Sequence, residues 1–173
     1  MLEKLCLKEF DQIYNLMEVS FPKDEYRSYF EQKALLDHPL YQIYVQKDVN
    51  AQVVKGFLAV WDLDFFVFFE HFAVNPAYRN SGIGSKMLVE FSEMLGKMVC
   101  LEVEPPDSEM ASRRIGFYER NNFFFNEYPY TQPALSKGQK PVPLFIMTYG
   151  RPISKQEFDT IKNKLYTQVY KQF

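Results

Sequence analysis

Arg79, Gly82 and Gly84 lie where an apolar stretch of the chain gives way to an amphipathic one. A helix that starts within this glycine pair would carry unsatisfied N–H groups and a partial positive charge at its first turn. Glycine has no Cβ, so the main chain can come close enough to an anion for several amides to contact it. Arg79 adds a planar, charged fork on the approach side. The segment could therefore hold a diphosphate.

The segments on either side of this loop support that interpretation. Residues 65–74 are aromatic and β-branched, are too short to span a membrane and end at Asn75-Pro76, which is typical of a buried strand. After the glycines, a helical apolar pattern runs until Gly96 ends it. The residues of this pattern are Met87, Leu88, Phe91, Met94 and Leu95.

A dinucleotide-binding Rossmann unit is the main alternative for a Gly-x-Gly pattern at a helix start. Glu102 and Glu104 lie about where that fold needs an acidic residue for the ribose. However, residues 75–81 separate the strand from Gly82, whereas the Rossmann turn follows its strand at once, and Met87 occupies the place of a third small residue. These spacings disfavour a nucleotide-dependent oxidoreductase, and the chain has no P-loop motif.

A carboxylate interrupts the apolar strand that leads to the loop. Glu70 lies between Phe69 and His71. Burial disfavours a charged carboxylate and raises its pKa, which suits a general base. Glu70 could act directly or through a chain of water molecules, or it could instead face solvent or pair with a lysine. Because side chains alternate along a strand, we expect only one of Glu70 and His71 to face an acceptor cleft.

Composition limits the class of protein. The 173 residues are 47% hydrophobic, enough for one substantial core, and we expect a single domain over residues 1–173. A net charge of −2 with scattered Lys and Arg predicts no nucleic-acid partner. The absence of a signal peptide and of a membrane-length apolar run predicts a cytoplasmic protein without membrane contact. Cys6, Cys100 and the two histidines have no metal-ligand spacing, so we expect no metal.

The pattern along the chain predicts an α/β (α+β) domain. A short strand at 5–7 precedes helices at about 10–20 and 24–36, and three strands with short polar connections then suit an antiparallel meander. A final helix at about 154–173 could pack on its own domain or on a second subunit, so we expect a monomer or a homodimer. The later strands are predicted at 41–46, 56–61, 65–74, 98–103, 123–130 and 144–149, with helices at 83–95 and 107–120.

A second motif follows the strand at 98–103. The helix at 107–120 carries Ala111, Ile115 and Tyr118 on one face and continues as F-Y-E-R-N-N-F at 117–123. This motif resembles the A-x-x-x-Y-x-x-x-G-F pattern of the GNAT superfamily of N-acetyltransferases. The R-x-x-G-x-G spacing after Val74-Asn75-Pro76 resembles the acyl-CoA loop of the same superfamily. Asn122 replaces the usual glycine, which its tolerance of the left-handed conformation permits. The asparagine that is common near the start of this helix is absent, which weakens any pantetheine contact from that position.

The resemblance spans about residues 4–150 and implies the fold and the donor. The GNAT fold has a mixed, mostly antiparallel central sheet of six to seven strands, flanked by helices and split between strands four and five. Acetyl-CoA would bind in that split, and no metal would be required. The resemblance further implies that the pantetheine arm pairs with Phe72, Ala73 and Val74, and that the diphosphate is received, with help from Arg79, by Asn80, Ser81, Gly82, Ile83, Gly84 and Ser85.

The same resemblance implies that Tyr118 protonates the departing sulfur of coenzyme A. A phenol with a reference pKa of about 10 can give a proton to a developing thiolate. The alternative is that Tyr118 is a core aromatic, because it shares an apolar stripe with Ala111 and Ile115.

Acceptor specificity in this superfamily usually comes from the first helix pair and from the late strand connection. Here those segments offer a carboxylate and several aromatic side chains, which could hold a cation or could be ordinary packing. The candidates are Glu25, Tyr26, Tyr29, Tyr128 and Tyr130, with Phe21, Phe30 and Gln132 nearby. We therefore predict acetyl transfer from acetyl-CoA to a primary amine of a small molecule or peptide. The alternative is a non-catalytic acyl-CoA-binding module that acts as a sensor or an assembly partner.

Overall fold

The computed structural model describes residues 2–48, 50 and 52–171. These residues form one seven-stranded sheet in the order β1-β2-β3-β4-β5-β7-β6. Neighbouring strands are antiparallel except β4 and β5, which are parallel. The predicted mixed, mostly antiparallel sheet is therefore confirmed. The strands are Glu3–Lys4 (β1), Tyr41–Asp48 (β2), Val53–Leu63 (β3), Phe66–Val74 (β4), Met98–Val103 (β5), Phe123–Gln132 (β6) and Val142–Tyr149 (β7).

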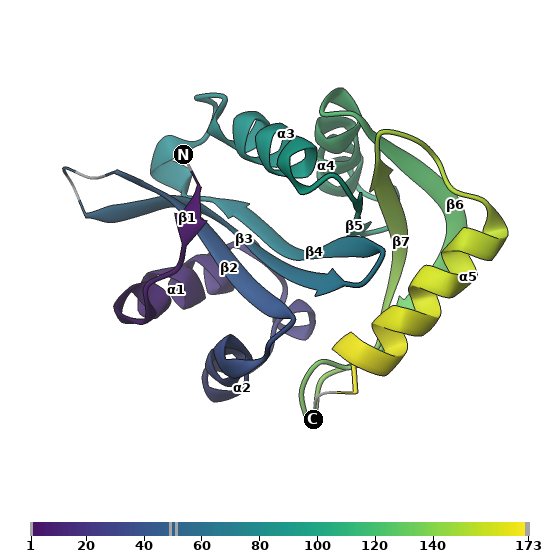
Figure 1. The fold of residues 1–173 in the computed structure, drawn as a ribbon, viewed down its shortest axis with the longest axis horizontal. Helices are drawn as coiled ribbons and strands as arrows, with labels where there is room; N and C mark the ends of the chain where they lie inside the picture. Colours follow the sequence, from purple (N-terminus) through teal and green to yellow (C-terminus); the bar gives the residue numbers. More distant parts are fainter. Residues whose placement is uncertain (1, 49, 51, 172–173) are drawn as a thin grey trace.

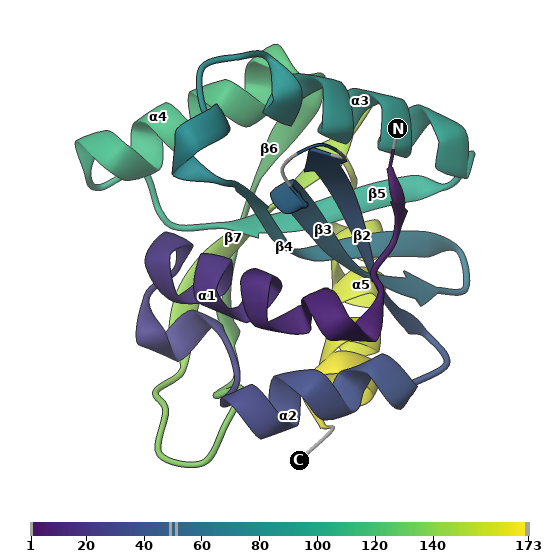
Figure 2. The same cartoon turned by 90° about the vertical axis from the view of Figure 1, so that its left-hand side faces the viewer.

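Helices cover both faces of the sheet (Figures 1 and 2). On one face lie α3 (Ile83–Leu95) and α4 (Glu109–Arg120), and on the other lie α1 (Phe10–Ser20) and α2 (Tyr29–Ala34). The fifth helix, α5 (Lys155–Lys164), runs along β6 and β7 (Figure 1). The buried apolar side chains form two clusters, one beneath α3 and α4 and the other beneath α1 and α5.

The C-terminal helix packs on its own sheet, which was one of the two predicted arrangements. Phe158, Ile161, Leu165 and Val169 all belong to the larger buried cluster. Residues 172–173 of the predicted helix lie outside the described residues, as does Val49 in the connection between β2 and β3. Within the described part of the chain, no helix has the length and apolar character needed to cross a membrane.

Strands β4 and β5 stay paired over only part of their length. Their register runs from Phe66 opposite Met98 to Phe69 opposite Leu101. At the point where the pairing stops, β4 has a bulge: Val60 of β3 pairs with Phe69, whereas the preceding Ala59 pairs with His71. Glu70 is therefore the extra residue of the bulge, and such a bulge bends its strand. The predicted split between the fourth and fifth strands is found here.

The first strand differs from the prediction of 5–7. Leu5 N still donates to Ile43 O at 2.8 Å, but the paired residues are Glu3–Lys4. The chain then leaves the sheet edge in a 3₁₀ turn, because the Glu9 carboxylate accepts a hydrogen bond from Cys6 N at 3.2 Å.

The single helix predicted over 24–36 is broken in the structure. Lys23–Glu25 forms a 3₁₀ turn, the next residue is extended, and α2 then runs only to Ala34 before a second 3₁₀ turn. The break lets the Arg27 side chain enter the interior, where it is 1% exposed. Glu31 accepts a hydrogen bond from Ser28 N at 3.2 Å, which favours a new helix start at this point.

Capping residues and glycines in the sequence predicted where α3 and α4 begin and end. Gly82 and Gly96 flank α3 with positive φ angles of 79° and 60°, as expected for residues that must adopt the left-handed conformation. Ser108 caps α4 by accepting a hydrogen bond from Ala111 N at 3.1 Å. Asn122, with φ of 67°, takes the left-handed conformation that its position after α4 requires. These local predictions are confirmed.

Candidate active site

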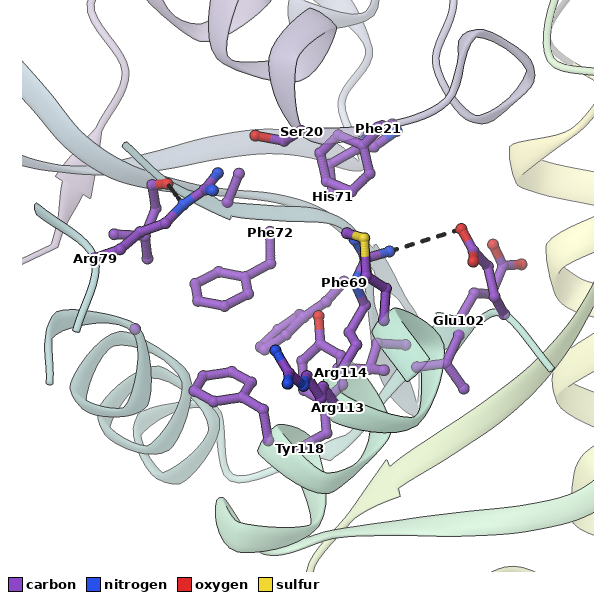
Figure 3. Close-up of a pocket in the computed structure, with 18 of the residues that line it drawn as sticks. Ser20, Phe21, Phe69, His71, Phe72, Arg79, Glu102, Arg113, Arg114 and Tyr118 are labelled. Carbon is purple, nitrogen blue, oxygen red and sulfur yellow. Dashed lines mark hydrogen bonds and ion pairs between the residues drawn. The ribbon is translucent and has the colours of Figure 1, made fainter. Parts of the chain in front are cut away.

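A cavity of about 740 Å³ opens where β4 and β5 part, and it extends between the start of α3, the side of α4 and the end of α1. Figure 3 shows Arg79 at one end of this cavity and Glu102 at the other, with Tyr118 facing Ser20, Phe21 and His71 across it. The cavity brings together most of the residues that the sequence predicted. Those lining it are Glu25, Glu70, Phe72, Ala73, Val74, Arg79, Asn80, Gly82, Ile83, Gly84, Ser85 and Tyr118.

The start of α3 fits a phosphate group. Within the described chain, no side chain caps this end of the helix, and its hydrogen bonding begins with Lys86 N donating to Gly82 O at 3.1 Å. The amides of the preceding residues are therefore helix-end donors. A Cβ at Gly82 would meet nothing within 4 Å, whereas one at Gly84 would lie 3.3 Å from both Phe72 and Val74. Gly82 thus borders open space, and Gly84 lets the helix approach β4 closely.

The loop before α3 is fixed to the end of β4. Arg79 Nε donates to Val74 O at 3.0 Å, and Asn75 Oδ1 accepts from Ala77 N at 3.0 Å. Ser81 Oγ donates to Tyr78 O at 2.5 Å, and Ser81 is the one predicted loop residue that does not line the cavity. The Arg79 guanidinium remains at the cavity, so this contact holds the arginine beside the helix start.

Tyr118 combines a packed ring with a place on the cavity wall. The residue is 7% exposed, and its ring meets Phe117 and Phe123 at centroid distances of 5.5 and 5.8 Å. Burial raises the pKa of Tyr118 to about 12, and the nearby Arg114 guanidinium opposes part of that increase. The phenol therefore keeps its proton at neutral pH, as a proton donor must.

The bulge in β4 changes the surroundings of Glu70 and His71. We expected only one of them on the cleft side, but both contact the segment that follows α1. Arg27 Nη1 lies 2.8 Å from Glu70 Oε1, and the two side chains are only 1% and 3% exposed. His71 Nε2 lies 2.7 Å from Glu25 O, and its Nδ1 is 3.6 Å from Glu70 Oε2. The extra residue in the bulge interrupts the alternation of side chains between the two faces of β4. The prediction that only one of Glu70 and His71 would face the cleft is therefore wrong.

Glu70 and His71 therefore differ in their electrostatic surroundings. Burial lowers the pKa of His71, against the opposing effect of the Glu70 charge, so His71 is neutral at neutral pH. Glu70 is neither solvent-facing nor paired with a lysine, because its side chain forms an ion pair with Arg27. Glu70 also lines the cavity, so its role as a general base, directly or through water, stays a prediction.

We expect Glu70→Gln to lower the free energy of unfolding by about 3 kcal/mol, because removing one partner of a buried ion pair leaves the other charge poorly compensated. Urea unfolding would measure the change. Glu90→Gln is the matched control, because the Glu90–Lys86 pair is exposed on α3, and its loss should change stability by less than about 0.5 kcal/mol. Equal stability of the two variants would contradict a structural role for the Arg27–Glu70 pair.

The cavity also carries a pair of carboxyl groups. Glu25 lies in the 3₁₀ turn after α1, and Glu104 lies just after β5. Burial, together with the nearby Glu104 charge, raises the pKa of Glu25 to about 7. Arg114 Nη1 is 3.8 Å from Glu104 Oε1. A cationic amine that reaches this part of the cavity would therefore meet two carboxyl groups.

Four predicted acceptor residues are not on the cavity wall. Tyr26 and Tyr130 are each 7% exposed in the larger buried cluster. Tyr29 donates to Asp11 Oδ1 at 2.5 Å, and Tyr128 donates to Ile153 O at 3.3 Å. Glu25 lines the cavity, as do Phe21 and Gln132, whereas the four tyrosines take the alternative role of packing. Tyr26 and Tyr29 follow the break after Glu25, and Tyr128 and Tyr130 lie on β6.

Several cavity residues were not predicted as site residues. Glu102 and Glu104 entered the sequence interpretation only as possible ribose ligands. Alternation along residues 98–103 places Glu102 on the same face as the buried Cys100, and a carboxyl at that position is a signal that could have been used. The other unpredicted lining residues include Met110, Arg113, Arg114 and Phe117 on α4.

Comparisons with known proteins agree with this geometry. A family model described as an acetyltransferase (GNAT) domain matches residues 39–123. A solved GNAT-family structure from Bacteroides thetaiotaomicron is 33% identical, covers 98% of each chain and has a TM-score of 0.86. No curated protein gives a match.

More distant structures share the fold. A spermidine N-acetyltransferase from Vibrio cholerae is 15% identical, with a TM-score of 0.63 over 86% of this chain and 94% of that one. An aminoglycoside 6'-N-acetyltransferase in complex with coenzyme A is 12% identical, with a TM-score of 0.62 over 90% of this chain and 99% of that one. The family model and the 33% identical structure show that this chain belongs to the GNAT family of acetyltransferases, whose acetyl donor is acetyl-CoA.

Proposed function

We propose that this protein transfers the acetyl group of acetyl-CoA directly to a primary amine carried by a small molecule or a peptide. The observation that carries the proposal is the single cavity that joins an uncapped helix start, the free side of β4, a protonated Tyr118 and a carboxyl-lined far end. We further propose that residues 1–173 act as one domain, in the cytoplasm, as a monomer or homodimer.

The donor side is supported by the edge of β4 and by the start of α3. Beyond Phe69, β4 no longer pairs with β5, so the main chain of Phe72, Ala73 and Val74 can pair with the pantetheine arm as with an added strand. The helix-end amides of residues 80–85 would take the diphosphate, and Arg79 would add a charge-assisted contact. All of these residues except Ser81 line the cavity.

We expect Arg79→Ala to raise KM for acetyl-CoA about tenfold with little change in kcat, because the side chain binds the donor far from the reacting atoms. Initial rates at varied acetyl-CoA would show this. Arg113→Ala tests whether removing another arginine of the cavity raises KM for acetyl-CoA in the same way. Arg113 is exposed on α4 and pairs with Glu109. An unchanged KM in Arg79→Ala would remove the arginine from the donor site.

In the transfer, the acceptor nitrogen loses two protons and the departing sulfur gains one. An ammonium group must lose one proton before its nitrogen can attack the thioester carbonyl, and the departing sulfur must gain one. Tyr118 is placed to give its phenolic proton to the sulfur, which takes the electrons of the broken C–S bond. The nitrogen loses its second proton as the amide forms, and that proton can return to Tyr118 through water. Glu25 at the far end would attract the cationic acceptor.

A panel of primary amines incubated with acetyl-CoA tests the proposal. We expect at least one amine to release the coenzyme A thiol and to gain the mass of one acetyl group. The panel should span polyamines, aromatic amines and peptides with a free N-terminus. Tight binding of acetyl-CoA without turnover for every amine would contradict the proposal and favour an acyl-CoA-binding module.

A further inference from the structure

Glu102 lies on β5 at the point where the pairing of β4 and β5 ends. It follows Leu101, the last β5 residue paired with β4, and it faces the bulge residue Glu70 across the opening. Its side chain lines the cavity, at the end opposite Arg79 (Figure 3). An acceptor amine that enters from the side of α1 would reach the split beside this carboxyl group, which the proposed transfer does not yet use.

A residue from the far end of the chain holds the Glu102 carboxyl. The Tyr170 hydroxyl donates a hydrogen bond to Glu102 Oε1, and Tyr170 itself is 4% exposed. Tyr170 follows a π-helical turn, Leu165–Val169, in which Tyr170 N donates to Leu165 O at 3.0 Å. A π-helical turn inserts one residue into the helical register, so it changes the direction of the side chain that follows, and such turns often occur at functional sites.

The charges around Glu102 differ from those around Glu70. Burial raises the pKa of Glu102 to about 8, and the Tyr170 hydrogen bond opposes this increase. The carboxylates of Glu70 and Glu25 contribute to this raised pKa, whereas the Arg27 guanidinium opposes it. The other nearby titratable groups are Cys100 and Tyr166, whose own pKa values the Glu102 charge helps to raise.

We propose that Glu102 accepts a proton from the acceptor ammonium group and that Tyr170 is the positioning residue that orients its carboxylate. This inference rests on the proposed acetyl transfer. In the step, an N–H bond of the ammonium breaks, its electron pair stays on nitrogen, and the proton forms an O–H bond on Glu102. The carboxyl group later releases that proton to solvent through the cavity. Glu70, which is paired with Arg27, then serves to anchor the bulge.

A base of this kind suits the reaction. General-base catalysis is most effective when the pKa of the base lies near the working pH, and a carboxyl titrating about pH 8 meets this condition. Glu70 differs from Glu102 in its partner, because Glu70 Oε1 already lies 2.8 Å from the Arg27 guanidinium. The hydroxyl of Tyr170 leaves one carboxylate oxygen, Oε2, for the amine, because the hydrogen bond is made to Oε1.

The test is the pH dependence of kcat/KM for an accepted amine at saturating acetyl-CoA. The ionisation of the amine is the same for every variant, so differences between variants report on the enzyme. We expect Tyr170→Phe to move the acidic limb to higher pH by about one to two units, because the lost hydrogen bond had stabilised the charged carboxylate. Glu102→Gln should lower kcat/KM at pH 8 about 100-fold. The acidic limb that remains in this variant should reflect only the ionisation of the amine.

Tyr166→Phe is the matched control. Tyr166 lies in the same π-helical turn, and its hydroxyl donates to Thr131 O rather than to a carboxylate. This variant loses the same atom from the same segment, so its acidic limb should coincide with that of the wild type. Calorimetric titration with coenzyme A should give unchanged affinity in Glu102→Gln, which shows that the fold is intact.

Three outcomes would overturn the inference. A limb that is identical in the wild type and Tyr170→Phe removes the positioning role while acetyl transfer stands. A limb that persists in Glu102→Gln but disappears in Glu70→Gln assigns the proton to Glu70. If the wild type releases no thiol with any amine, the proposed transfer itself fails, and the role of Glu102 fails with it.

Discussion

Tyr118→Phe is expected to lower kcat about 100-fold while KM for acetyl-CoA stays unchanged, because the variant keeps the ring and loses only the acidic proton. The ring is packed against Phe117 and Phe123, and that packing does not depend on the hydroxyl. With the pKa of Tyr118 at about 12, the phenol stays protonated across the range in which the enzyme can be assayed. The loss in kcat should therefore be the same from pH 6 to pH 9, as read from initial rates of thiol release.

Tyr149→Phe gives a control in the same cluster. Its ring contacts Phe123 at 5.3 Å, and its hydroxyl makes a long contact of 3.5 Å with Glu93 on the exposed side of α3. Loss of this hydroxyl should leave kcat unchanged. Comparable losses in both variants would mean that hydroxyl groups stabilise the cluster generally, and an unchanged kcat in Tyr118→Phe would exclude it as the proton donor.

Gly82→Asp is expected to weaken acetyl-CoA binding about 100-fold relative to Gly82→Asn, because the aspartate places a negative charge at the start of α3 where the diphosphate should lie. The two variants have the same shape and share the strain of a positive φ angle, 79° at this position. A Cβ here would meet nothing within 4 Å, so neither variant should disturb packing. Calorimetric titration with coenzyme A would measure both dissociation constants.

Comparing Gly82→Asp with Gly82→Asn separates the effect of the added negative charge on binding from the effect of the side chain's shape. Asparagine tolerates the left-handed conformation well, so Gly82→Asn should bind nearly as tightly as the wild type. Raising the salt concentration should narrow the difference, because exposed charges are screened. If both variants bind coenzyme A equally, the diphosphate does not lie beside Gly82.

The local structure of the candidate donor side could be predicted from the sequence because its signals are local. Gly82 needs a positive φ angle, Gly84 needs a close approach to β4, and the helix that follows repeats its apolar residues at helical spacing. Ser108 and Asn122 likewise mark the two ends of α4 through their own backbone conformations. Each of these features depends on residues within a few positions of one another.

The acceptor side could not be predicted as well, because it depends on contacts between distant segments. The break before α2 accompanies the ion pair between Arg27 and Glu70, and the bulge at Glu70 lies in the pairing of β4 with β3. Neither contact leaves a periodic pattern in the sequence. The tyrosines at 26 and 130 pack in the larger buried cluster, those at 29 and 128 pack against it, and none of the four lines the cavity. Glu102 was likewise overlooked, since its partner Tyr170 is 68 residues away.

A crystal structure of the protein with coenzyme A tests the central claim most directly. We predict diphosphate oxygens about 2.7–3.2 Å from main-chain nitrogens at the start of α3. The pantetheine arm should lie along Phe72, Ala73 and Val74, with the sulfur in the split on the side of Tyr118. A diphosphate bound away from Gly82 and Gly84, or a sulfur that lies outside the split between β4 and β5, would contradict the account.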